Sequence, residues 1–239
     1  MFVSLDKVVE ELKKNKFSHI LSEKINIKAN EITDLALLKR SWDYLPIDPY
    51  MKKGDTYRRR CFGKFIVDIA NKTIDFVDDN IFFQSSEINC YAGGIERKLP
   101  QMSDIISSNV ILRKIIENTL NAFLMYKKKK SNIWDVFVHQ FRIESKKGIQ
   151  GNPTPEGIHK DGHTFISMHM IGRYNIEGGT SYIYDENRNK IKEIVLEENL
   201  ESILLDDMEM YHSAFVISSI NDKKGFRDLM VIDYREKRQ

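Results

Sequence analysis

Short β-type segments crowd the last hundred residues of the sequence and restrict the possible fold more than any other feature. Seven runs rich in β-branched and aromatic residues are joined by turns, and none of the intervening stretches is long and periodic enough for a helix. The runs are 134–145, 163–172, 180–186, 190–196, 201–207, 213–220 and 228–236. Strands at this density predict a β-sandwich or a β-barrel.

Helical patterns precede these strands. We expect the first 45 residues to be mainly helical, with Asp6 as the first N-cap and Pro46 as the end of a second helix. The apolar residues at helical spacing are Val8, Val9, Leu12 and Phe17 in the first helix and Ile32, Leu35, Leu38 and Trp42 in the second. Another helix is expected over residues 104–126, where isoleucines form an apolar stripe. Upstream of it, Asn71 and Lys72 favour a hairpin between segments 61–70 and 73–79.

The whole chain is expected to form one domain. Hydrophobic residues make up 41% and charged residues 30% of the sequence, which suits a globular core and excludes a disordered chain. No linker, internal repeat or low-complexity tract interrupts it. We therefore predict an α+β, mainly β domain over residues 1–239, in which a helical extension (1–50) packs on a metal-binding β core (134–235).

The charge balance argues against nucleic acid as a partner. A net charge of +2 provides no strong positive field, and no basic track contains interleaved aromatic residues. The run Lys127–Lys130 is expected to be a solvated helix end, where cations complement the helix dipole.

A cytoplasmic protein that does not bind membranes is expected. The N-terminus becomes charged at Asp6 without an apolar signal-peptide core, and no apolar stretch reaches the roughly 18 residues of a membrane span. Cys61 and Cys90 lack a CxxC pattern and are expected to be reduced thiols. The sequence leaves the oligomeric state open, and it is compatible with a homo-oligomer.

A possible metal site stands out among the six histidines. His159 and Asp161 are two positions apart, so on an extended strand their side chains leave the same face. His212, at the start of a later strand, can supply a third ligand. Two imidazoles and one carboxylate form the facial triad that suits non-haem iron(II) and leaves adjacent positions open. An HxD pair alone occurs often by chance, so this assignment depends on the residues around it.

Arg227 is the residue that most strengthens the metal hypothesis. It lies on a strand expected to run beside the strand of His212, where its guanidinium can hold the distal carboxylate of a dicarboxylic oxo-acid while the ion chelates the other end. A surface position on the strand is the alternative.

Other polar residues are candidates for the same pocket. Gln140 and Arg142 share one face of their strand, and that face either binds cosubstrate and substrate carboxylates or forms a polar outer surface. Arg58, in the cluster Arg58–Arg60, could hold a substrate carboxylate. Gln84 and Glu87 could receive a substrate ammonium group.

The segment HKDGHTFISMHMIGRYNIEGGTSYIYD, the distal His212 and FRDLMVIDY together resemble bacterial 2-oxoglutarate/iron dioxygenases that hydroxylate free L-amino acids, a family typified by L-isoleucine dioxygenase. The resemblance covers roughly residues 40–235 and implies a double-stranded β-helix (jelly-roll, cupin-like) core with flanking N-terminal helices. It also implies His159, Asp161 and His212 as iron ligands, Arg227 as the partner of 2-oxoglutarate, and Fe(II), 2-oxoglutarate and O2 as cofactor and cosubstrates. The implied reaction hydroxylates an unactivated C–H bond of an amino acid or close derivative and yields succinate and CO2.

The loop after the HxD motif departs from that family. Gly162 and His163 stand where the type enzyme has acidic residues, so isoleucine itself is not assumed as the substrate. His163 could be a substrate contact, a surface residue or a spare ligand. Two other functions also remain: a dioxygenase acting on a peptide, a protein or another metabolite, and a cupin-like binding module without catalysis.

Overall fold

A seven-stranded antiparallel sheet forms the centre of the protein. The structure, a computed structural model, describes residues 4–129 and 131–237. The strand order is β1–β11–β7–β14–β6–β2–β3. The bounds are β1 (Phe17–Ile20), β2 (Arg58–Asp68), β3 (Thr73–Val77), β6 (Ile133–Ser145), β7 (Phe165–Tyr174), β11 (Ser202–Leu205) and β14 (Gly225–Glu236). Its longest pairing joins β14 to β6, from Gly225↔Ser145 to Glu236↔Trp134.

Smaller sheets face one side of this large sheet. One has the order β10–β9–β12, and two strand pairs, β13–β8 and β4–β5, complete the set. The bounds are β4 (Ile81–Phe83), β5 (Glu96–Lys98), β8 (Ile176–Gly178), β9 (Ser181–Tyr184), β10 (Lys190–Ile194), β12 (Tyr211–Ala214) and β13 (Ile217–Ser219). Ile166, Met168 and Met170 of β7 pack against Ile183 and Ile194 of the smaller sheet in a buried cluster. The fold is thus mainly β, with the jelly-roll arrangement that the sequence predicted.

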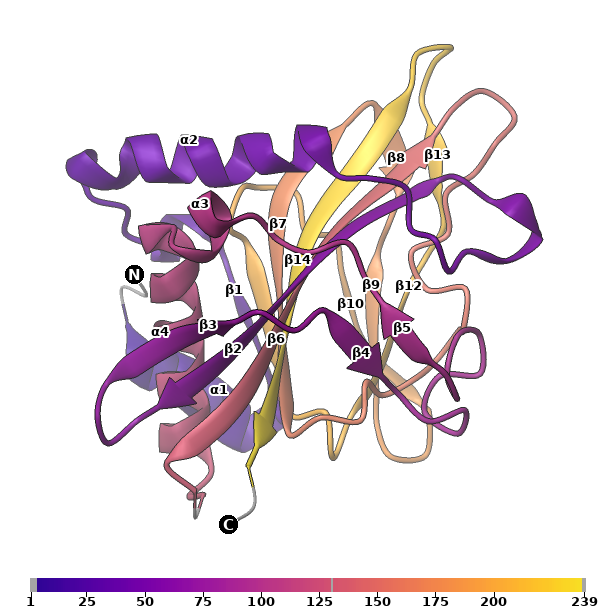
Figure 1. The fold of residues 1–239 in the computed structure, drawn as a ribbon. Helices are drawn as coiled ribbons and strands as arrows, with labels where there is room; N and C mark the ends of the chain where they lie inside the picture. Colours follow the sequence, from indigo (N-terminus) through magenta and orange to yellow (C-terminus); the bar gives the residue numbers. More distant parts are fainter. Residues whose placement is uncertain (1–3, 130, 238–239) are drawn as a thin grey trace.

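The helices cover the opposite side of the large sheet (Figure 1). The bounds are α1 (Leu5–Asn15), α2 (Ile32–Arg40), α3 (Asp104–Ser107) and α4 (Val110–Tyr126), with short 3-10 turns η1 (Ser22–Lys24), η2 (Ala29–Glu31), η3 (Ser41–Tyr44) and η4 (Lys52–Gly54). On α4 the buried residues Ile111, Ile115 and Ile116 recur at helical spacing and face the sheet. In η3, Trp42 is fully buried and its indole N–H donates to the carbonyl of Phe141. Among the described residues, no helix has the length and apolar character needed to cross a bilayer.

The N-terminal segment differs from the helical expectation. Helix α1 begins at Leu5 after Ser4 as N-cap, so Asp6 lies in its first turn rather than at its cap. Lys16 adopts a left-handed conformation with φ 68° and ends the helix. Phe17, expected in the helix, begins β1, which pairs with β11 along the sheet edge. Pairing with a distant strand overrides the local helical pattern here.

Two expected elements are each divided. The helix over 104–126 breaks at Ser108 and Asn109, because the Asn109 side chain accepts the backbone N–H groups of Ile111 and Leu112 and starts α4. The strand expected over 213–220 becomes β12 and β13, which pair with different partners, β9 and β8.

Turns explain two further outcomes. The hairpin between β2 and β3 is confirmed, and Lys72 takes the left-handed conformation in its turn with φ 57°. The sequence EGGT (177–180) predicts a hairpin whose glycines supply positive φ, and Gly178 and Gly179 do have positive φ, at 79° and 71°. The hairpin expected around them is absent, because β8 pairs with β13 whereas β9 pairs with β10 and β12.

The first lysine of the run after α4 is paired rather than simply solvated, whereas Lys128 is exposed as expected. Lys127 donates to the carboxylates of Asp206, at 3.0 Å, and Glu209, at 2.5 Å. Lys130 lies outside the described residues.

Replacing Asn109 by alanine should lower the free energy of unfolding by about 1–2 kcal/mol, because two N–H groups at the start of α4 lose their acceptor. Ser103→Ala is the matched control, since Ser103 is the N-cap of α3 but makes no side-chain capping bond. Urea unfolding of both variants measures the difference. Equal losses would mean that the Asn109 bonds contribute nothing specific.

Candidate active site

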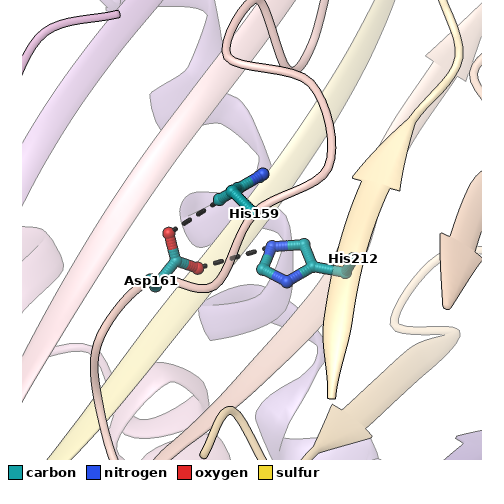
Figure 2. A group of neighbouring side chains, drawn as sticks. All are labelled: His159, Asp161 and His212. Atoms are coloured by element: carbon teal, nitrogen blue, oxygen red, sulfur yellow. Dashed lines mark ion pairs between the residues drawn. The ribbon is translucent and has the colours of Figure 1, made fainter. Parts of the chain in front are cut away.

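Three side chains from two segments meet between the sheets. His159, Asp161 and His212 each offer a ligand atom, and these atoms lie within 4.8 Å of one another. The Asp161 carboxylate faces both rings from one side, 3.6 Å from Nε2 of His159 and 3.5 Å from Nε2 of His212 (Figure 2). The structure therefore brings together the three residues that the sequence singled out.

Backbone pairing sets the positions of the two histidines. His159 and His212 form an isolated antiparallel bridge, in which the His159 N–H donates to the His212 carbonyl at 3.0 Å and the reverse bond measures 2.9 Å. Because His212 lies on β12, this bridge attaches the loop that carries His159 to the small sheet. The strand expected to carry His159 and Asp161 is absent, because only His159 is bridged and Asp161 lies in the loop. The Asp161 carboxylate nevertheless approaches the same point.

Asp207 anchors the loop that presents Asp161. Its carboxylate accepts the backbone N–H groups of Asp161, Gly162 and His163 at 2.8–2.9 Å. Asp207 is itself 1% exposed, so these bonds are shielded from water. Gly162 turns the loop with φ 80°, a conformation that L side chains rarely adopt.

Burial and neighbouring charges set the protonation of the three ligands. Burial opposes a charge on Asp161, but its contacts with His159 and His212 hold the pKa of Asp161 well below its usual range. Burial, together with the charge of His159, lowers the pKa of His212 to about 3. Burial also disfavours charge on His159, yet Asp161 raises its pKa to about 9. Binding of a metal ion at neutral pH therefore displaces a proton from His159, whereas Asp161 and His212 are already in their ligand forms.

The donor set fits iron(II). Two imidazole nitrogens and one carboxylate oxygen form the set found in non-haem iron oxygenases, and three donors leave further positions for a chelating cosubstrate and oxygen. The Nδ1–H of His159 donates to the Gly157 carbonyl, 2.9 Å away, which leaves Nε2 for the ion.

Arg227 is a buried arginine without a carboxylate partner among the described residues. It is 2% exposed, its Nη2 donates to Oγ of Ser181 at 3.3 Å, and its Nε has no hydrogen-bond partner. Burial, with a further contribution from the charge of Arg173, lowers the pKa of Arg227 to about 10. An unpaired buried guanidinium is costly, so this position favours an anionic ligand.

The strand that carries Arg227 does not lie where the sequence suggested. β14 pairs with β6 and β7 in the large sheet, whereas β12, the strand of His212, pairs with β9. The expectation that the two strands run side by side is therefore wrong. Arg227 and His212 still line the same cavity, because the two sheets face each other across it.

That cavity joins the metal ligands to several other expected residues. It offers about 100 Å³ of interior space, and its walls include the triad, Arg227, Arg58 and Gln84. The Gln84 amide donates to the Asp161 carbonyl at 3.0 Å. Arg58 pairs through Nε with the buried carboxylate of Asp48 at 2.9 Å.

Gln140 and Arg142 lie on the opposite face of the large sheet. Their strand alternates as expected, but His139 and Phe141 line the cavity instead. Gln140 donates to Ser41 on the helical side. Arg142 forms two 2.7 Å bonds with Asp228, a pairing that leaves it no role at the cavity. The sequence pattern identified which residues share a face but not which face is inside.

Two more residues that were expected to contact the substrate, Glu87 and His163, also lie outside the cavity. Glu87 is exposed in the loop after β4. The His163 ring is buried beside Phe82 and Phe137, with Nε2 3.7 Å from Asp233, so it is neither a surface residue nor placed to contact a substrate in the cavity.

Sequence reasoning missed three residues of this region: Asp207, Arg97 and Glu156. Arg97 and Glu156 line the cavity. Asp207 follows the run ILLD directly and could have been recognised as an acid next to a strand end. Arg97 stands between Glu96 and Lys98 in a loop-rich stretch and belongs to no recognisable motif. Glu156 precedes His159 by three positions, which alone signals little.

Replacing Asp207 by alanine should weaken iron(II) binding by about 10- to 100-fold, because the loop that presents Asp161 loses its acceptor. Anaerobic iron titration measures the affinity. Asp206→Asn is the matched control, since Asp206 is equally buried but bonds to Tyr126 and Lys127 instead. Unchanged affinity in the Asp207 variant would show that the loop keeps its shape without that carboxylate.

Comparison with known proteins agrees with this geometry. A family model described as 2OG-Fe dioxygenase matches residues 39–233. L-isoleucine-4-hydroxylase of Bacillus thuringiensis is 24% identical over 239 residues, covering 98% of this chain and 96% of the relative. 3(1)-hydroxy-L-isoleucine 4-dioxygenase of Pantoea ananatis (strain AJ13355) is 22% identical over 222 residues, covering 87% and 84%.

A solved structure agrees in fold. The crystal structure of a bsmA homolog from Methylobium petroleophilum PM1 superposes with a TM-score of 0.87 at 23% identity, covering 99% of this chain and 94% of that chain. The family model spans most of the sequence, and the His–Asp–His donor set lies within the matched range. The chain therefore belongs to the 2OG-Fe dioxygenase family, whose members use iron(II), 2-oxoglutarate and oxygen.

Proposed function

We propose that this dioxygenase hydroxylates an unactivated C–H bond of a free L-amino acid or a close derivative while 2-oxoglutarate becomes succinate and CO2. The observation that carries the proposal is the single cavity that holds both the ligand triad and the unpaired Arg227. Both curated relatives are named for reactions of isoleucine or hydroxyisoleucine, and the alignments with them extend over 98% and 87% of the chain.

Each residue of the cavity has a distinct task in this reaction. His159, Asp161 and His212 would hold the iron, and Arg227 would bind the distal carboxylate of 2-oxoglutarate through its planar guanidinium. Iron with 2-oxoglutarate and oxygen supplies the oxidising chemistry that breaks the C–H bond. The apolar side chains Met168, Leu229 and Val231 line the same cavity and exclude water from it.

The other functions considered from the sequence receive less support. A binding module without catalysis has no need of a complete donor set together with a buried, unpaired arginine. A peptide or protein substrate receives less support, because both curated relatives are named for reactions of isoleucine or hydroxyisoleucine. We propose that the chain acts as a single domain, since one buried cluster includes both the N-terminal helices and the large sheet.

A cytoplasmic location remains part of the proposal. Cys61 and Cys90 are both free thiols, which agrees with a reducing compartment.

Arg227→Ala should raise the KM for 2-oxoglutarate by about 30-fold or more, because losing one partner of a buried charge pair costs roughly 2–5 kcal/mol. The KM for the amino acid should change much less. Arg227→Lys should recover only part of the loss, since an ammonium group lacks the planar fork. Steady-state kinetics with each substrate varied in turn distinguishes the effects, and equal increases in both KM values would remove Arg227 from the cosubstrate site.

Succinate release from 2-oxoglutarate should increase when at least one free L-amino acid is added with iron(II) and ascorbate. His159→Ala, Asp161→Ala and His212→Ala should each abolish this release, because each removes an iron ligand. A screen across the twenty amino acids, with mass spectrometry of the products, makes the measurement. Stimulation by peptides or nucleosides alone would place the substrate in another class, and an active Asp161→Ala variant would contradict the ligand assignment.

A further inference from the structure

Four arginines line the cavity, and not all of them are paired with a carboxylate. Besides Arg227, its walls include Arg58 and Arg60 from β2 and Arg97 from β5. Asp48 neutralises Arg58 through the 2.9 Å bond and lies 3.8 Å from Nη1 of Arg60. Arg97, like Arg227, has no carboxylate within ion-pair distance among the described residues.

Arg97 is held in place by groups that carry no charge. It is 2% exposed, and its Nη2 donates to Oε1 of Gln84 at 2.7 Å. The guanidinium lies 5.1 Å from the ring centroid of Phe82, and its Nε has no hydrogen-bond partner. Burial, and then the charge of Arg58, lowers the pKa of Arg97. A fully buried guanidinium with an unused donor is an energetic cost that a bound anion would remove.

An acidic residue without a lysine or arginine partner among the described residues, Glu156, lines the same cavity. The Glu156 carboxylate is mostly buried and lies 3.4 Å from Nε2 of His159, the only ion-pair contact it makes among the described residues. That nitrogen is the atom that His159 offers to the metal, since Nδ1 is occupied at the Gly157 carbonyl. Glu156 forms no ion pair with a lysine or an arginine among the described residues, although it lines the same cavity as Arg97.

We propose that Arg97 binds the α-carboxylate of the substrate and Glu156 its α-ammonium group. The inference rests on the proposed function and narrows it to α-amino acids in which both groups are free and charged. A residue inside a peptide offers neither charge, so binding it would leave a buried cation and a buried anion unmatched. Arg97 is thus a specificity-determining residue distinct from Arg227, which serves the cosubstrate.

Matched substrates test both contacts. The amino acid that best stimulates succinate release is compared with its primary amide, which lacks the carboxylate charge, and with its N-acetyl form, which lacks the ammonium charge. The wild-type enzyme should prefer the free amino acid over each analogue by at least about tenfold in kcat/KM.

Arg97→Gln should raise the KM for the amino acid by at least about tenfold, leave the KM for 2-oxoglutarate within about twofold, and abolish the preference over the amide. Glu156→Gln should abolish the preference over the N-acetyl form and leave the preference over the amide. Lys98→Gln is the control, because Lys98 is the exposed neighbour of Arg97 on β5. Arg97→Lys keeps the charge and should recover part of the preference.

The ratio of kcat/KM for two substrates, measured on one enzyme preparation, does not depend on the fraction of a variant that is folded. Retention of the full acid-over-amide preference in Arg97→Gln, or equal increases in both KM values, would overturn the role of Arg97. If Glu156→Gln keeps the full preference for the free amino acid over its N-acetyl form, the role of Glu156 is overturned. A screen in which no free amino acid stimulates wild-type turnover would instead reject the proposed function, and this inference with it.

Discussion

The two backbone hydrogen bonds between His159 and His212 hold the site together. They join a loop without regular pairing of its own to a strand of the small sheet, so two imidazoles reach one point before any ion binds. Asp207 then fixes the next turn of the same loop through three N–H groups, which determines where Asp161 points. The iron ligands are therefore arranged by main-chain bonds, and their own side chains remain available for the metal.

Side chains alternate along each strand, so one face of the large sheet lines the cavity and the other packs against the helices. On β6, His139 and Phe141 face the cavity, while Gln140 faces the helices. One face must therefore tolerate polar and charged groups beside apolar ones, and the other holds the main hydrophobic core with α4. This division lets the cavity contain several buried charges without disturbing the packing that stabilises the fold.

Sequence patterns predicted the mainly β fold, because period-two alternation is a local property. The HxD spacing identified His159 and Asp161 as ligands, but the strand on which that prediction relied is a loop held by Asp207. The patterns did not predict that Phe17 begins a strand, since its pairing with Leu205 is a distant contact. The pattern on β6 showed that Gln140 and Arg142 share a face, but only the packing of helices on the sheet decides which face is inside. No sequence pattern marked Arg97, because the lack of a nearby carboxylate partner is a property of the folded cavity and not of the neighbouring sequence.

The short strand β1 has a consequence for how molecules of this protein meet one another. It pairs with β11 at the end of the large sheet, where all four residues of β11 are buried. Without β1, an apolar strand with free N–H and C=O groups would form the sheet edge and could pair with the same strand of another molecule. The αL turn at Lys16 directs the chain into the sheet, so that β1 covers β11 and only a four-residue strand is left at this edge. A very short edge strand offers few free backbone groups to a second molecule.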